Sequence, residues 1–322
     1  MTGADTKKEV IFWGLLAGIF GLLPVVSHND YHLIMANHII VWGLFAVAFN
    51  MLFGITGMLS FGQALFYGIG GYGVGLMVKY LGKAWFLPGM AAGVLAAAVL
   101  AYLLGFLIIR VSGVFFTILT LAFGQLAWQV TFRWYHVTGG DDGIQGIIPP
   151  GILGNKVFYY YVCLACVLAS VWYLRSLSNS PLGLILRCVR QNPARVRFLG
   201  RHVRRNQRRV YVISSVFAAL AGGLMSGVDN SVHTNMFYWT TSGEVILMSV
   251  LGGIHQFFGP FIGAALIKII EDVVGSRTEF WPLIIGLLMM TMVLAFPRGV
   301  VGEFQMLKAR WQWRALERAR RG

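Results

Sequence analysis

The chain has 322 residues, of which 57% are hydrophobic and only 12% are charged. A soluble domain carries roughly 25% charged residues, so this chain cannot cover a water-facing surface of its size. Aromatic residues make up 14% of the sequence, which excludes intrinsic disorder. A collagen-like fibre is excluded because 40 Gly accompany only 9 Pro without a three-residue period. The class that remains is a polytopic membrane protein.

Nine apolar runs follow one another along the chain, and a membrane-spanning helix needs about 20 such residues. The runs are Val10–Val26, Leu33–Phe53, Ala64–Val78, Phe86–Ile109, Val114–Val130, Val157–Leu174, Val210–Val228, Val245–Ile270 and Trp281–Phe296. The first follows Lys7 and Lys8, but it is long and no A-x-A site follows it, so we interpret it as a span and not as a signal peptide. We predict an all-α polytopic membrane protein with about eight to ten transmembrane helices, in which residues 1–322 form one domain.

The eighth run is broken, because Gly252, Gly253, Gly259 and Pro260 interrupt it. If this run dips into the membrane and returns, the chain has eight full spans plus a re-entrant pair. If each half crosses, the chain has ten spans. Non-helical backbone at membrane depth is tolerated where protein or a water-filled cavity surrounds it, so the broken run indicates a translocation path.

The segment Asn50–Met77 is rich in glycine and in polar residues for a membrane span. Close helix packing explains this composition as well as a path for cargo does. Asn50 and Gln63 must face protein or water, because an unpaired amide in hydrocarbon is costly. The candidate path residues are Asn50, Gly62, Gln63, Tyr67, Gly252, Gly253 and Gly259.

Most of the net charge of +14 comes from two basic stretches. Residues 175–209 contain ten Arg and no acid, and residues 298–322 contain six Arg and one Lys against two Glu. Basic clusters beside apolar spans follow the positive-inside rule, whereas a nucleic-acid-binding domain presents a basic face. We therefore expect a cytoplasmic loop at 175–209, a cytoplasmic basic tail at 298–322, and both termini in the cytoplasm.

Inside the first basic stretch, the sequence predicts two short helices joined by an elbow. Leu182, Ile185, Leu186 and Val189 have the spacing of one helix face. Asn192-Pro193 then ends this helix and starts another, and Gly200 is a plausible stop. A membrane-surface helix attracted to anionic lipid is one interpretation. A docking element for a cytoplasmic partner is the other, and the elbow favours it.

The sequence contains no constellation of catalytic or metal-binding residues. Gly68–Gly73 matches G-x-G-x-x-G, but no acid follows before Asp141 to hold a ribose, and no phosphate-binding loop is present. Cys163 and Cys166 lie within an apolar run, where packing is the expected role. We expect Lys268, near a segment end, to reach water. An ion-coupled secondary transporter is disfavoured because the span interiors hold almost no acids.

Four stretches together resemble the LivM-type permease subunit of ABC importers for branched-chain and other hydrophobic amino acids. They are Asn50–Ala64 (NMLFGITGMLSFGQA), Thr138-Gly139-Gly140 with Gly143-Ile144, Arg187–Gly200, and Gly252-Gly253 with Gly259-Pro260 and Gly263. Two positions depart from the family pattern: Pro193 stands where an acid usually follows the Asn, and Ile254-His255-Gln256 follow the Gly pair. The same scaffold serves urea, short amides and aromatic acids, which stay open as alternative cargoes.

The resemblance implies a multi-pass protein of the bacterial inner membrane that works with partner subunits. These are a second permease, two cytoplasmic ATPase subunits that bind ATP and Mg, and a periplasmic substrate-binding protein. No cofactor is expected in this chain. The resemblance also implies that the loop Arg187–Gly200 receives the motion of the ATPases. The coupling residues are then Arg187, Arg190, Asn192, Pro193, Arg195 and Gly200.

Overall fold

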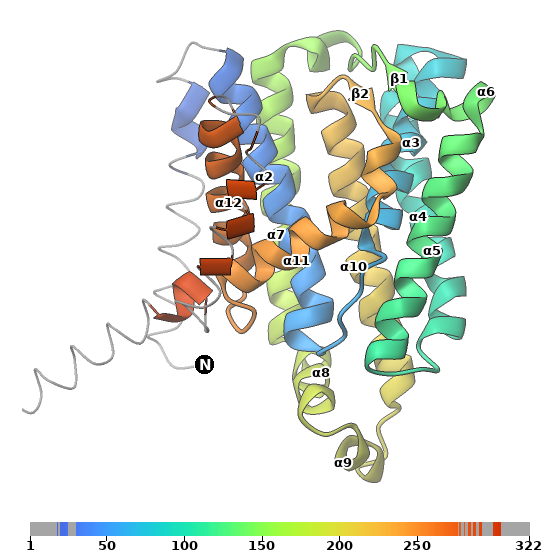
Figure 1. Ribbon diagram of the computed structural model, residues 1–322, viewed down its shortest axis with the longest axis vertical. Coiled ribbons are helices and arrows are strands. Elements are labelled where there is room, and N and C mark those ends of the chain that lie inside the picture. The colour runs from blue at the N-terminus through green and yellow to red at the C-terminus, as the bar shows by residue number, and fades with distance from the viewer. Residues whose placement is uncertain are drawn as a thin grey trace, which may run out of the picture.

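The computed structural model describes residues 18, 20–24 and 30–275, together with residues 277, 280, 283–284, 286–287, 290–291 and 299–303. This part of the chain is a bundle of helices (Figure 1). Its long helices are α2 (Asp30–Asn50), α3 (Gln63–Leu81), α4 (Phe86–Ile108), α5 (Val114–Arg133), α7 (Lys156–Asn179) and α10 (Val203–Val228). The shorter helices are α6 (Tyr135–Thr138), α8 (Pro181–Gln191), α9 (Pro193–Phe198), α11 (Trp239–Gly252) and α12 (Gly259–Gly275).

Five segments of the described chain are long and apolar enough to cross a membrane. They are Asp30–Ile55, Lys83–Ile108, Val114–Arg133, Lys156–Asn179 and Val203–Val228. Each contains one of the predicted apolar runs, or all but the last residue of it. The runs Val10–Val26 and Trp281–Phe296 and both termini lie largely or wholly outside the described residues.

The spans differ in how far neighbouring helices surround them. In α2, 89% of the most apolar window is buried, whereas the corresponding shares in α4 and α5 are 28% and 22%. α2 is therefore the central helix, in contact with α7, α10, α11 and α12. α4 and α5 lie at the periphery, where their exposed Leu, Val and Phe side chains suit contact with lipid.

Close helix packing accounts for much of the glycine in α3. A Cβ atom on Gly70 would lie 1.8 Å from the carbonyl oxygen of Ala219, and one on Gly222 would lie 1.9 Å from that of Tyr67. Backbones of α3 and α10 approach this closely only because these positions lack side chains. For Gly70, the packing interpretation of the segment Asn50–Met77 is therefore the correct one.

The start of α2 and the segments 79–85, 133–156 and 229–232 meet at one end of the bundle, opposite to α8 and α9 (Figure 1). Lys156 bonds Asp30 at 2.6 Å, and Lys79 donates to the carbonyl of Val137 at 3.0 Å. A two-residue strand, β1 (Ile144–Gln145), pairs antiparallel with β2 (Ser231–Val232). The sequence did not predict this short pairing, which joins the backbone groups of two crossing turns and leaves the all-α class unchanged.

The predicted break in the eighth run is confirmed. α11 ends at Gly252, Gly253 has a φ of +113°, and α12 begins at Gly259. The 14 residues of α11 rise about 21 Å, which is shorter than the ~30 Å hydrocarbon core. The count of eight spans plus a re-entrant pair, or of ten, stays a prediction.

Candidate functional site

The connection between α2 and α3 is a second interruption, and it lies inside the bundle (Figure 1). α2 continues into a π-helical turn, Met51–Ile55, and residues 56–62 are not helical. Side chains of α5 and α11 bond the freed backbone groups. Thr117 Oγ1 donates to the carbonyl of Leu59 at 2.9 Å, and Thr120 Oγ1 accepts from the N–H of Phe61 at 3.2 Å. Hydroxyl groups thus replace the missing helical hydrogen bonds.

The start of α3 is held in the same way. Ser242 Oγ of α11 accepts from the N–H of Ala64 at 2.9 Å. A Cβ atom on Gly62 would lie 2.5 Å from the carbonyl oxygen of Thr120, so only glycine fits there. The interruption is therefore held jointly by α5 and α11, and Ser242 connects α11 directly to the start of α3.

Two clefts lie above and below the buried middle of α2. The outer cleft, of about 470 Å³, is lined by Trp42 and Tyr67 and by residues of α10, α11 and α12. The inner cleft, of about 540 Å³, is lined by Asn50 and Gly54 and by residues of α7, α8 and the α11–α12 turn. Eight residues of helix separate Trp42 from Asn50, which is about 12 Å. Leu44–Phe49 between them are completely buried, so the two clefts are not connected along this helix.

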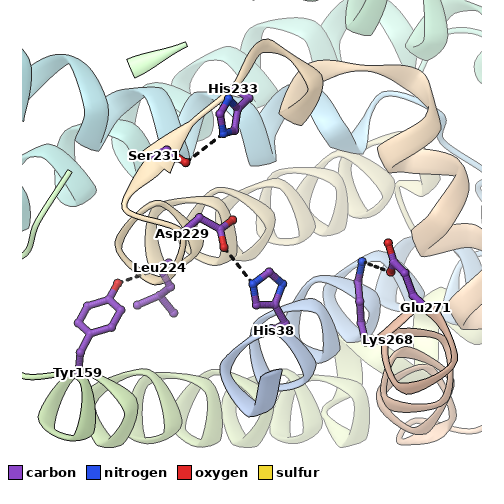
Figure 2. A network of polar contacts seen from close by, with 8 residues as sticks. All are labelled: His38, Tyr159, Leu224, Asp229, Ser231, His233, Lys268 and Glu271. Atoms are coloured by element: carbon purple, nitrogen blue, oxygen red, sulfur yellow. Dashed lines mark hydrogen bonds and ion pairs between the residues drawn. The ribbon is translucent and has the colours of Figure 1, made fainter. Parts of the chain in front are cut away.

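Ionisable side chains lie in pairs along the outer cleft (Figure 2). His38 Nε2 of α2 lies 2.9 Å from Asp229 Oδ1 at the end of α10. Lys268 Nζ of α12 lies 2.7 Å from Glu271 Oε2 and 3.6 Å from Glu244 Oε2 of α11. Lys268 lines the cleft, yet only 9% of this residue is exposed, because the two carboxylates and the Trp42 ring surround its amine.

Part of the lining of the outer cleft is aromatic. Trp42 and Tyr67 line it with their ring centroids 5.7 Å apart, and the buried ring of Phe45 stacks on Tyr67 at 4.8 Å. Met225 and Met236 add flexible apolar surface. The cleft therefore offers both signs of charge beside an apolar wall, an arrangement that suits a small amphipathic solute.

The seven candidate path residues do not share one cleft. Tyr67 lines the outer cleft and Asn50 the inner one. Gln63 lies at the start of α3, fully buried, and neither its amide oxygen nor its amide nitrogen has a hydrogen-bond partner in the described part of the chain. Since Gln63 and Tyr67 are four residues apart, they share a face of α3.

The candidate glycines of α11 and α12 lie where the two helices touch. A Cβ atom on Gly252 would lie 1.8 Å from the carbonyl oxygen of Gly259, and one on Gly259 would lie 2.5 Å from that of Gly253. These glycines allow close packing around the turn, and none of them lines either cleft.

The predicted elbow is confirmed in detail at the end of the bundle that carries α8 and α9 (Figure 1). Asn192 caps α9, since its Oδ1 accepts from the N–H of Arg195 at 3.1 Å, and Pro193 occupies the first turn. Gly200 has a φ of +74° and follows the end of α9, as a helix stop requires.

The apolar face of α8 packs against protein. Leu186 and Val189 are buried, and Val189 contacts a cluster with Val196 of α9 and Val203 of α10. A helix lying on a lipid surface keeps its apolar face for the acyl chains. That interpretation of α8 is therefore wrong, and the elbow is a fixed part of the bundle.

Arginine side chains connect the elbow to both interruptions. Arg190 Nη1 donates to the carbonyl of Gly54 in the π-helical turn and lies 3.2 Å from His255 Nδ1 in the α11–α12 turn. Arg187 Nη2 donates to the carbonyl and hydroxyl of Ser178 at 3.0 Å. Arg195 is exposed.

Sequence reasoning missed the charged residues of the outer cleft. His38 and Asp229 are 191 residues apart, and Glu244 and Lys268 lie on separate helices, so no local pattern joins them. One signal was available: Lys268 and Glu271 have the i, i+3 spacing of a helical ion pair.

Two interrupted helical segments lie at the centre of the bundle, with a polar cleft on each side of the buried middle of α2. Together with the basic elbow at one end, they define a multi-pass membrane permease. A family model described as branched-chain amino acid transport system / permease component matches residues 31–293. The chain belongs to this family.

Several curated permeases are similar to the chain. It is 27% identical to the high-affinity branched-chain amino acid transport system permease protein LivM of Escherichia coli K12, over 93% of this chain and 76% of that protein. It is 25% identical to a probable LivM of Methanocaldococcus jannaschii (84% and 94%). It is 24% identical to LivH of Escherichia coli K12 (83% and 93%). No solved structure matches.

The buried ion pairs predict a stability effect. Lys268→Met leaves Glu244 and Glu271 without their cation, so we expect the free energy of unfolding to fall by about 1–3 kcal/mol. Lys156→Met is the matched control, because its pair with Asp30 is mostly exposed and contributes under about 1 kcal/mol. Thermal unfolding of the purified protein in detergent measures both. Equal shifts for the two variants would contradict the role given to Lys268.

Proposed function

We propose that this chain is one of two permease subunits of an ATP-driven importer in the bacterial inner membrane, and that the cargo is a branched-chain or related apolar amino acid. The similarity to both LivM and LivH supports a pair of permeases, because each is named as a permease protein of a branched-chain amino acid transport system. Two ATPase subunits supply ATP hydrolysis with bound Mg, and a periplasmic binding protein delivers the cargo. The chain itself is a transport subunit and not an enzyme.

In this proposal, cargo enters through the outer cleft. A zwitterionic amino acid carries one charge of each sign, and the cleft offers His38 and Lys268 beside Asp229 and Glu244. The apolar side chain of the amino acid fits against the wall formed by Trp42 and Tyr67. To pass to the inner cleft, the cargo needs the buried stretch of α2 and the start of α3 to move apart. Gln63, at the start of α3, lies in this closed region between the two clefts.

The contacts of Arg190 carry the proposal for coupling. One guanidinium connects the elbow to the turn after α2 and to the turn between α11 and α12. A partner that displaces the elbow therefore pulls on both interruptions at once. ATPases acting on α8 and α9 would in this way shift α11, and α11 holds α3 through Ser242.

An ion-coupled secondary transporter is the second candidate, and the charges of the outer cleft favour it. His38–Asp229 and Lys268–Glu244 are titratable pairs within the bundle, and carriers driven by protons use such groups. The two candidates differ in their energy source. Uptake by reconstituted vesicles that needs ATP and the ATPase subunits supports the importer, and uptake driven by a proton gradient alone supports the carrier.

Gln63 provides the test of the path. We expect Gln63→Leu to reduce ATP-dependent leucine uptake at least tenfold, equivalent to about 1.4 kcal/mol in the barrier, while the complex still assembles. Leu is well tolerated in a membrane helix, so a scaffold role predicts no loss. Gln145→Leu, at an exposed position of β1, is the control and should transport normally. Normal uptake by the Gln63→Leu complex would remove Gln63 from the path.

Arg190 provides the test of coupling. Arg190→Gln removes the charged contact to Gly54 and His255, so leucine uptake per ATP hydrolysed should fall several-fold while ATP hydrolysis persists. Arg205→Gln, an exposed arginine on α10, removes the same charge without these contacts. Uptake and hydrolysis are measured together in vesicles with the complete complex. If Arg190→Gln left the ratio of leucine uptake to ATP hydrolysis unchanged, the elbow would have no role in coupling.

Native Cys188 provides a test of sidedness, because it is the exposed cysteine of α8 whereas Cys163 is buried. In intact cells we expect Cys188 to resist a membrane-impermeant maleimide, and in inside-out vesicles to react with it. Asp141→Cys, at an exposed loop position of the opposite end, should show the reverse. Labelling of Cys188 from outside would overturn a cytoplasmic elbow.

A further inference from the structure

A third cleft, of about 520 Å³, lies at the elbow end of the bundle between α9, α10 and the turn from α4 to α5. Four arginines from separate parts of the chain line it: Arg110, Arg190, Arg197 and Arg204. No aspartate or glutamate lines this cleft. We call it the arginine cleft.

In the described part of the chain, these four arginines are not paired with carboxylates. Within the described chain, no Asp or Glu oxygen lies within ion-pair distance of Arg110, Arg190, Arg197 or Arg204. Arginine is always protonated, and like charges facing one concavity raise its potential and attract an anion. The planar guanidinium fork matches phosphate oxygens particularly well.

One wall of the arginine cleft is apolar and faces away from the protein. Val111 and Val114 line it, and their side chains are 39% and 72% exposed. Next to them, Phe115 at the start of α5 is 75% exposed. Because α5 is a peripheral span, these side chains lie on the surface that meets lipid. A ligand here touches guanidinium groups at one end and hydrocarbon at the other.

We propose that the arginine cleft binds an anionic phospholipid, with the phosphate between Arg110 and Arg204 and the acyl chains along α5. A free phosphate would satisfy the charges but would leave the exposed valines unused, so the apolar wall favours the lipid. Basic pockets between spans on the cytoplasmic side are suited to acidic headgroups.

The arginine cleft lies next to the interruption between α2 and α3. Its lining also includes Thr56, Gly57, Met58 and Leu59, which belong to the interruption between α2 and α3. A headgroup in the cleft therefore bridges the peripheral turn, the elbow and this interruption. Occupancy should stabilise the elbow in the position that the structure shows.

Binding of phosphatidylglycerol to the purified full-length chain in detergent tests the proposal, with native mass spectrometry counting bound lipids. Arg110→Gln with Arg204→Gln removes two cleft arginines. Arg205→Gln with Arg209→Gln is the matched control, since both are exposed, belong to the same basic segment and lie outside the cleft. We expect at least tenfold weaker binding for the first pair and little change for the second.

Two further arms separate the sources of the anion. Phosphatidylcholine, which has no net charge, should bind at least tenfold more weakly than phosphatidylglycerol. Inorganic phosphate at millimolar concentration should leave the bound lipid in place. Equal losses for the two arginine pairs would show a diffuse basic surface and overturn the proposal. Displacement by inorganic phosphate, or equal binding of both lipids, would overturn it as well.

Discussion

The central constraint on this protein is that backbone interrupted within a membrane must find new hydrogen-bond partners. Between α2 and α3 those partners are hydroxyl groups: Thr117 and Thr120 on α5, and Ser242 on α11. They fix α5 and α11 around the start of α3, and the glycines of α3 then bring α10 close. The arrangement of the helices around the clefts follows from satisfying this one short segment.

The two clefts and the closed stretch between them describe one state of a transport cycle. A solute cannot pass while Leu44–Phe49 are buried on every side. Each interruption divides a long helical segment into shorter helices that can move separately. Arg190 of the elbow contacts both interruptions. On the proposed path, alternating access would need no unfolding of a span, only a change in how these shorter helices pack.

Local patterns were sufficient to predict the described apolar spans, the break at Gly252–Gly259 and the elbow at Asn192-Pro193. Each depends on neighbouring residues: hydropathy, glycine, or an Asn cap before proline. The contact of His38 with Asp229 and that of Arg190 with Gly54 depend on how distant helices pack, so no local pattern contains them. The strand pair β1–β2 was missed for the same reason, since each strand has only two residues.

The burial of α2 has a consequence for how the chain is made. α2 emerges from the ribosome long before α7, α10 and α12, yet it carries Asn37, His38 and Asn50, which lipid does not solvate. The partner of His38 is synthesised 191 residues later. Until then this helix needs shelter from hydrocarbon, either at the membrane insertion machinery or against the helices already made. Biogenesis of this permease therefore depends on retaining its central helix until its partners arrive.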